Sequence, residues 1–109
     1  MQNLTTTSEF DALLDAPTAL VYKHSTRCPI SAMAYEEIGE LTRVHPDAPI
    51  YMVDVHADRT VSEYIASKLG ITHHSPQAVL LRDGKAVWKA EHFDIKARAM
   101  ARQLGHDDD

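Results

Sequence analysis

The sequence of 109 residues contains a single cysteine, Cys28. One cysteine cannot form an internal disulfide, so a disulfide framework and a redox cycle between two thiols of the same chain are both excluded. The chain also lacks any apolar run approaching the ~20 residues that cross a bilayer. Its first ten residues, MQNLTTTSEF, have neither a basic start nor an apolar stretch. We therefore expect no secretory signal and a cytoplasmic location.

Positive charge is also scarce, with 11 Lys and Arg against 16 Asp and Glu and a formal net charge of -5. This balance argues against phosphate backbones and anionic membranes, so we expect neither nucleic acid nor membrane as a partner. Glycine is rare, and no phosphate-cradling loop is present. The 44% hydrophobic and 25% charged residues are typical of a globular protein. The length predicts one domain over residues 1–109, with a disordered acidic tail at 106–109.

Hydrophobic periodicity and turn residues predict four helices and four strands. The helices are expected at residues 6–15 with Ser8 as the cap, from Pro29 to about His45, from Asp58 or Thr60 to Gly70, and from about His92 to Leu104 with Ile95, Ala99 and Met100 facing inward. The strands are expected at residues 19–22, 50–55, 78–81 and 86–88. Asp83 and Gly84 form a strong signal for a two-residue hairpin between the last two strands.

The order of these elements is α-β-α-β-α-β-β-α. A strand-helix-strand unit requires a parallel pair with a right-handed crossover, and the hairpin adds an antiparallel pair. The order therefore predicts an α/β domain with a four-stranded mixed sheet and helices on both faces. This is the thioredoxin-like arrangement.

Cys28 falls at the junction between the first predicted strand and the long helix. Pro29 suits the first helical position, which makes Cys28 the N-cap residue. There the helix dipole and the neighbouring Arg27 favour thiolate over thiol, and the thiolate is the nucleophile. Ser31 follows three residues later, where its hydroxyl could hydrogen-bond the sulfur but could not displace it. Ser75 and Pro76 precede the third strand, where thioredoxin-like folds keep a cis-proline facing the reactive cysteine.

The run HSTRCPIS around Cys28, the run HSPQ at 74–77, and Val87 and Trp88 with His92 resemble the monothiol bacilliredoxin family, the YtxJ-like proteins. The resemblance covers nearly the whole chain at matching spacing. It implies a thioredoxin fold and the removal of bacillithiol, a low-molecular-weight thiol, from mixed disulfides on cytosolic client proteins.

The resemblance also implies roles for individual residues. Cys28 would be the attacking cysteine, supported by Arg27, Pro29, Ile30 and Ser31. Thr26, His74, Ser75 and Pro76 would contact the substrate, with Pro76 as the cis-proline. His74 stands where an acidic residue is expected in the family, which affects the local charge and client preference.

Other interpretations of Cys28 remain open at this point. A thioredoxin-like binding module, or a dimer that holds an iron–sulfur cluster through two Cys28 thiolates, would use the same fold. A buried structural Cys28 is a third alternative. His24 and His73 or His74 could approach Cys28, but their spacing matches no usual zinc pattern, so we expect no metal.

Overall fold

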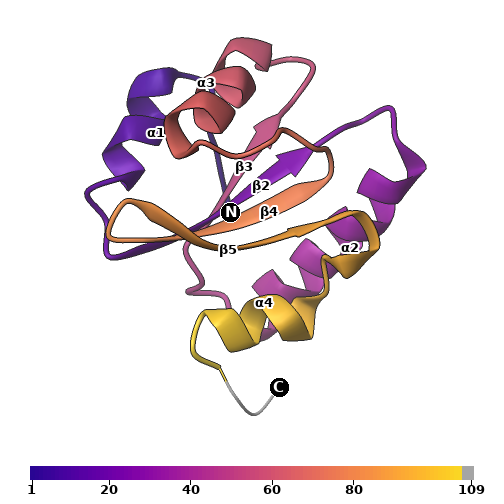
Figure 1. Ribbon diagram of the computed structural model, residues 1–109. Helices are drawn as coiled ribbons and strands as arrows, with labels where there is room; N and C mark the ends of the chain where they lie inside the picture. Colours follow the sequence, from indigo (N-terminus) through magenta and orange to yellow (C-terminus); the bar gives the residue numbers. More distant parts are fainter. Residues whose placement is uncertain (107–109) are drawn as a thin grey trace.

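The computed structural model describes residues 1–106, which form a mixed sheet with helices on both faces (Figure 1). The strands are β1 (Gln2–Asn3), β2 (Thr18–His24), β3 (Ile50–Asp54), β4 (Gln77–Arg82) and β5 (Lys85–Glu91). The helices are α1 (Thr7–Leu13), α2 (Pro29–Val44), α3 (Arg59–Leu69), the short 3-10 helix η1 (His92–Asp94) and α4 (Ala97–Gln103). The strand order is β1-β3-β2-β4-β5, with β1, β3 and β2 parallel and β4 and β5 antiparallel to their neighbours.

The α/β architecture agrees with the expectation from the sequence, but the sheet has five strands rather than four. The additional strand is β1, whose two residues are exposed and pair with Tyr51 and Met52 of β3. Two exposed polar residues carry no alternating hydrophobic pattern, so the sequence offered no signal for this strand.

Helix α1 begins at a different cap from the one expected. Thr6, rather than Ser8, is the N-cap residue, and its Oγ1 accepts the Glu9 N–H at 3.1 Å. Glu9 Oε1 in turn accepts the Thr6 N–H at 3.0 Å, which completes a capping box. The helix is therefore shorter than the range 6–15 predicted from its apolar edge.

The last predicted helix, 92–104, is interrupted. Residues His92–Asp94 form η1, Ile95 is extended with φ -79° and ψ 96°, and only Ala97–Gln103 is α-helical. The break allows the Ile95 side chain to enter the core, where it is 1% exposed. Met100 is buried as expected, whereas Ala99 is half-buried and Ala101 takes the second buried position.

The two faces of the sheet carry separate hydrophobic clusters, which α1 and α3 cover on one side and α2 and α4 on the other (Figure 1). Neighbouring residues of the central strand point to opposite sides, so Val21 belongs to the first cluster and Leu20 and Tyr22 to the second. The β4–β5 hairpin turns at Asp83 and Gly84 as predicted, both with positive φ. A Cβ at Gly84 would lie 2.6 Å from the Leu14 carbonyl oxygen, so this close approach to the end of α1 requires glycine.

The expected disordered tail falls mostly outside the described residues, because 107–109 are not among them. His106 is described, and its backbone N–H donates to the Ala101 carbonyl at 2.8 Å. Among residues 1–106, no helix combines the length and the apolar character needed to cross a membrane.

Candidate functional site

Cys28 lies where the chain leaves β2 and enters α2. It is the N-cap residue, with φ -117° and ψ 122°, and Pro29 occupies the first turn of the helix as the sequence predicted. The N–H groups of Ser31 and Ala32 donate to the Cys28 carbonyl oxygen at 3.0 and 3.3 Å. The Cys28 side chain is half-buried, so its sulfur can be reached at the positive end of a 16-residue helix.

Ser31 closes the loop that carries Cys28. Its side chain is 0% exposed, and its Oγ accepts the backbone N–H of Ser25 at 3.3 Å. Ser25 Oγ accepts the Arg27 N–H at 3.3 Å and lies 2.8 Å from His56 Nε2. The sequence left open a hydrogen bond between the Ser31 hydroxyl and the Cys28 sulfur, and the contact that the described residues show for Ser31 Oγ is the one with the Ser25 N–H. Ser31 instead holds the backbone on which the cysteine sits.

Tyr22 stabilises this loop through a hydrogen bond from β2, a role that the sequence analysis missed. The Tyr22 side chain is fully buried on β2, and its hydroxyl donates to the Ser31 carbonyl oxygen at 3.2 Å. The Tyr22 hydroxyl oxygen also lies 2.9 Å from His24 Nδ1. Burial raises the pKa of the Tyr22 phenol, and the charges that Tyr35 and Cys28 can carry act in the same direction. Because its pKa is raised, the Tyr22 phenol stays protonated and can donate. The Ser31 carbonyl oxygen gives it the partner that a buried tyrosine hydroxyl needs.

Pro76 lies in the loop directly before β4, the strand next to β2. The Ser75–Pro76 peptide bond is cis, as expected, and Pro76 is buried. β2 and β4 pair up to Lys23 and Gln77, so Pro76 follows level with His24 at the exit of β2. The His92 N–H donates to the Pro76 carbonyl oxygen at 3.2 Å, which ties the end of β5 to this loop.

The other candidate residues differ in their exposure to solvent. Thr26 and Arg27 are exposed, whereas Ile30, His74 and Ser75 are half-buried. The His74 ring meets the His92 ring edge-on, with centroids 5.7 Å apart. Arg27 and Ser75 line one cavity, so the residues next to Cys28 and Pro76 share a surface.

Lys23 is a second residue that the sequence analysis did not identify. It lies one strand position before His24, and its side chain is 0% exposed. Its Nζ donates to the Ser62 carbonyl oxygen at 3.1 Å and lies 3.0 Å from His73 Nδ1. Burial lowers the pKa of Lys23 to about 8, and burial together with the positive Lys23 lowers the pKa of His73. A lysine within the apolar run LVYKH is the sequence signal that could have revealed it.

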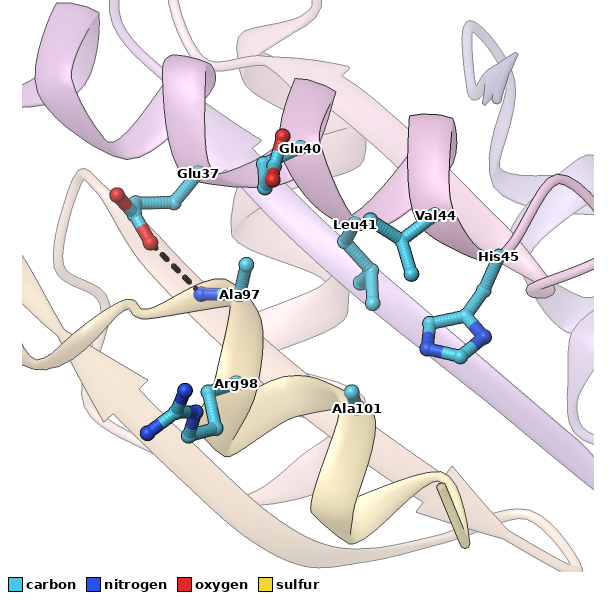
Figure 2. A pocket seen from close by; sticks show the side chains of 8 residues that line it. All are labelled: Glu37, Glu40, Leu41, Val44, His45, Ala97, Arg98 and Ala101. Atoms are coloured by element: carbon cyan, nitrogen blue, oxygen red, sulfur yellow. Dashed lines mark hydrogen bonds between the residues drawn. The ribbon is translucent and has the colours of Figure 1, made fainter. Parts of the chain in front are cut away.

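A second cavity, of about 350 Å³, lies away from Cys28 between α2 and α4 (Figure 2). Leu41, Val44 and Ala101 line its apolar part. At one end, Glu37 Oε1 accepts the Ala97 N–H at 2.8 Å and so caps the first turn of α4 (Figure 2). This contact fastens one helix to the other, and the cavity contains none of the candidate site residues.

The histidines do not gather with Cys28. His24 contacts Tyr22 and the ring of Tyr35, His73 contacts Lys23, and His74 contacts His92. Among residues 1–106, no group of three or more His, Cys, Asp or Glu side chains is placed to hold a metal ion.

Comparison with known proteins agrees with this geometry. The family model described as monothiol bacilliredoxin BrxC matches residues 2–100. A solved structure described as a candidate oxidoreductase with a thioredoxin fold is 33% identical, with a TM-score of 0.86 over 94% of this chain and 92% of the other. Mitochondrial thioredoxin 3 from Saccharomyces cerevisiae is 25% identical, with a TM-score of 0.69 over 99% of this chain and 94% of its own.

Fasciola hepatica thioredoxin, at 20% identity, shares the fold with a TM-score of 0.71 over 95% of each chain. The sheet, the helix that begins at Cys28 and these relatives define a thioredoxin-fold protein of the thiol redox class. Within that class the chain belongs to the monothiol bacilliredoxin family, because the family model covers nearly its whole length.

Proposed function

We propose that this chain is a monothiol disulfide reductase that removes bacillithiol from mixed disulfides on cytoplasmic client proteins. The observation that carries the proposal is the position of Cys28. It is the half-buried N-cap of a long helix, and cis-Pro76 directly precedes β4, the strand next to β2. The attacking group would be the Cys28 thiolate, the nucleophilic form of a cysteine. The family match supports bacillithiol as the small thiol.

The reaction is one thiol–disulfide exchange. The Cys28 thiolate attacks the bacillithiol sulfur of the mixed disulfide, and a new S–S bond forms between these two atoms. The original S–S bond breaks, its electron pair stays on the client sulfur, and the client thiol takes up a proton. An external thiol then removes bacillithiol from Cys28 by the same exchange, because the chain has no second cysteine.

The other candidate residues would position Cys28 and the substrate, and would not themselves form or break bonds. Pro29 and Ile30 build the first turn of the helix, and Ser31 anchors the loop through the Ser25 N–H. Thr26, His74, Ser75 and Pro76 would contact the substrate, with the backbone of Ser75 offering an edge on which an extended peptide or thiol can pair. No residue in this scheme requires a metal.

The course of the reaction tests the proposal. Reduced protein mixed with a bacillithiol-capped client should give one bacillithiol adduct per chain and one freed client thiol, measured by intact-mass spectrometry. Cys28→Ala should abolish both products. Ser31→Cys should form an internal disulfide and release bacillithiol without an external thiol. Free client thiol in the Cys28→Ala reaction, or a covalent client complex without a bacillithiol adduct in wild type, would contradict the proposal.

A further inference from the structure

A cavity of about 440 Å³ is lined by Arg27, the residue before Cys28, and has more cationic than anionic side chains in its lining. We call it the cationic cavity. Its polar lining residues are Arg27, His56, Arg59, Ser62, Glu63, His73 and Ser75. They come from the loop before α2, the loop after β3, the first half of α3 and the loop before β4. Arg27 directly precedes Cys28 and Ser75 directly precedes Pro76, so the cavity borders the two loops that carry these residues.

The fixed charges of the cavity favour an anion. Arg27 and Arg59 supply two guanidinium groups, and Glu63 supplies one carboxylate. Arg59 Nε lies 3.1 Å from Glu63 Oε2, but the two side chains are 80% and 67% exposed. An ion pair this exposed stabilises little and leaves the other guanidinium nitrogens free to bind. Asp54 and Asp58 are the nearest other acids along the chain, but neither lines the cavity, and Asp54 accepts the N–H groups of His56 and Ala57.

Lys23 adds a third positive charge behind the cavity wall. Its Nζ is fully buried, and its partners among the described residues are the Ser62 carbonyl and His73 Nδ1, neither of which is a carboxylate. A buried cation with no counter-ion is costly in a protein, and an anion nearby offsets that cost. The wall formed by His73 separates this charge from the cavity.

The contact with Lys23 also fixes the chemistry of His73. An ammonium group has only donors, so His73 Nδ1 must accept and the ring proton must sit on Nε2. The exposed side of the neutral imidazole is then a hydrogen-bond donor. Arg27, Arg59 and His73 thus present donors around one space, as carboxylate recognition requires.

We propose that the cationic cavity binds a carboxylate of the low-molecular-weight thiol whose sulfur is transferred to Cys28. This inference rests on the proposed function, since it names the subsite for the non-sulfur part of that thiol. The volume is that of a small-molecule site rather than a client surface. The net charge of -5 repels anionic thiols from the protein as a whole. The cationic cavity would attract them locally and so favour anionic thiols over neutral ones.

The test uses three small disulfides with arms of equal length: dithiodipropionate is anionic, hydroxyethyl disulfide is neutral and cystamine is cationic. The rate of adduct formation on Cys28 is measured for each, and every protein's anionic rate is divided by its own neutral rate. Arg59→Gln and Lys23→Met should each lower this ratio by about two- to fivefold, the effect of one partly screened charge. Both variants should raise the ratio of the cystamine rate to the neutral rate.

Arg98→Gln is the matched control, because it removes the same charge at the cavity between α2 and α4. Its ratio should equal that of wild type, and an equal fall there would overturn the proposal in favour of a general charge effect. An unchanged ratio in both Arg59→Gln and Lys23→Met would also overturn it. A slower reaction of Arg59→Gln with an acidic-peptide disulfide alone would assign the cavity to the client instead.

A binding measurement separates this inference from the proposed function. In Cys28→Ser, dithiodipropionate should shift the NMR resonances of the His56 and His73 side chains, and cystamine should not. If wild type fails to react with hydroxyethyl disulfide, the proposed attack by Cys28 is wrong, while these shifts still decide what the cavity binds. Absence of the shifts would exclude the cavity as a carboxylate site.

Discussion

Lys23 shows how much of this protein depends on a single buried charge. Its ammonium group lies under α3, bound to the Ser62 carbonyl oxygen and to His73. Burial disfavours the charged form, and the pKa of Lys23 falls from 10.5 to about 8. The native protein therefore binds this proton more weakly than the unfolded chain does. Below about pH 8 the charge lowers the free energy of unfolding, and this destabilisation disappears as the pH rises toward 10.5.

We predict that wild type gains stability relative to Lys23→Met between about pH 7 and about pH 10, by on the order of 2 kcal/mol. Denaturant unfolding of both proteins at the two pH values measures the difference, and titrations common to both cancel. Lys89→Met, at an exposed position of β5, is the control and should show no such change relative to wild type. A constant difference between wild type and Lys23→Met would mean that the ammonium group of Lys23 is well solvated in the native state and keeps its ordinary pKa.

The residues of the site were predictable where the signal is local. Cys28 and Pro29 identify a helix start by themselves, and Ser75-Pro76 stands directly before an apolar run. The apolar run around Lys23 could have marked it as unusual, but the contacts of Tyr22, Lys23 and His73 were not predictable because they depend on which elements lie over the strand. The hydrogen bond from Lys23 to Ser62 spans 39 residues, a distance across which a sequence pattern carries no information.

At the scale of the elements, α4 depends on a cap supplied by another helix. Its N-cap residue, Lys96, makes no side-chain capping hydrogen bond, and the Ala97 N–H is instead bound by Glu37 of α2 (Figure 2). A seven-residue helix is not stable alone in water. The contact therefore holds α4 against α2 and completes the layer that covers one face of the sheet.

We predict that Glu37→Ala lowers the free energy of unfolding by about 1 kcal/mol, the usual effect of losing a capping acceptor. Glu37→Gln keeps a side-chain oxygen and should retain most of the stability. Glu36→Ala, an exposed neighbour on the same helix, should change it by less than about 0.5 kcal/mol. Denaturant unfolding measures all three variants. Equal losses in Glu37→Ala and Glu36→Ala would rule out the cap as the cause.

The elements themselves were predictable to different degrees. The start of α2 at Pro29 and the end of α3 at Gly70, which adopts a left-handed conformation, follow from residues that favour these positions. The interrupted segment 92–104 was not predictable as such, because Ile95 leaves the helix to fill space in a core formed by distant residues. Tertiary packing there overrides a continuous helical pattern.

At the scale of the whole molecule, one sheet lies between two hydrophobic clusters, and its strands contribute side chains to both. Val79 and Leu80 are neighbours on β4, yet they belong to different clusters. Disrupting one cluster must therefore disturb strands that the other also needs. The described chain has a radius of gyration of 12.5 Å, about that expected for a single folded domain of this length.

We predict that the two clusters unfold together. Ile65→Val weakens the cluster under α1 and α3 and should cost about 1 kcal/mol. Trp88 packs against the other cluster and reports on it by fluorescence. The fluorescence midpoint should shift by as much as the far-ultraviolet circular dichroism midpoint. A Trp88 transition that stays in place while the dichroism shifts would show two independently unfolding halves.

The sheet order also bears on synthesis at the ribosome. β2 is the central strand, but its neighbour β4 is made only after α2, β3 and α3 have been added between His24 and Gln77. Until then one edge of β2, which is more buried in the folded protein than β1 or β3, has no partner, and such an edge favours pairing with other chains. Cys28 emerges with the early half and Pro76 with the late half. A nascent chain that ends before β4 therefore carries its only thiol without the loop that faces it, so the cysteine is chemically exposed before its site exists.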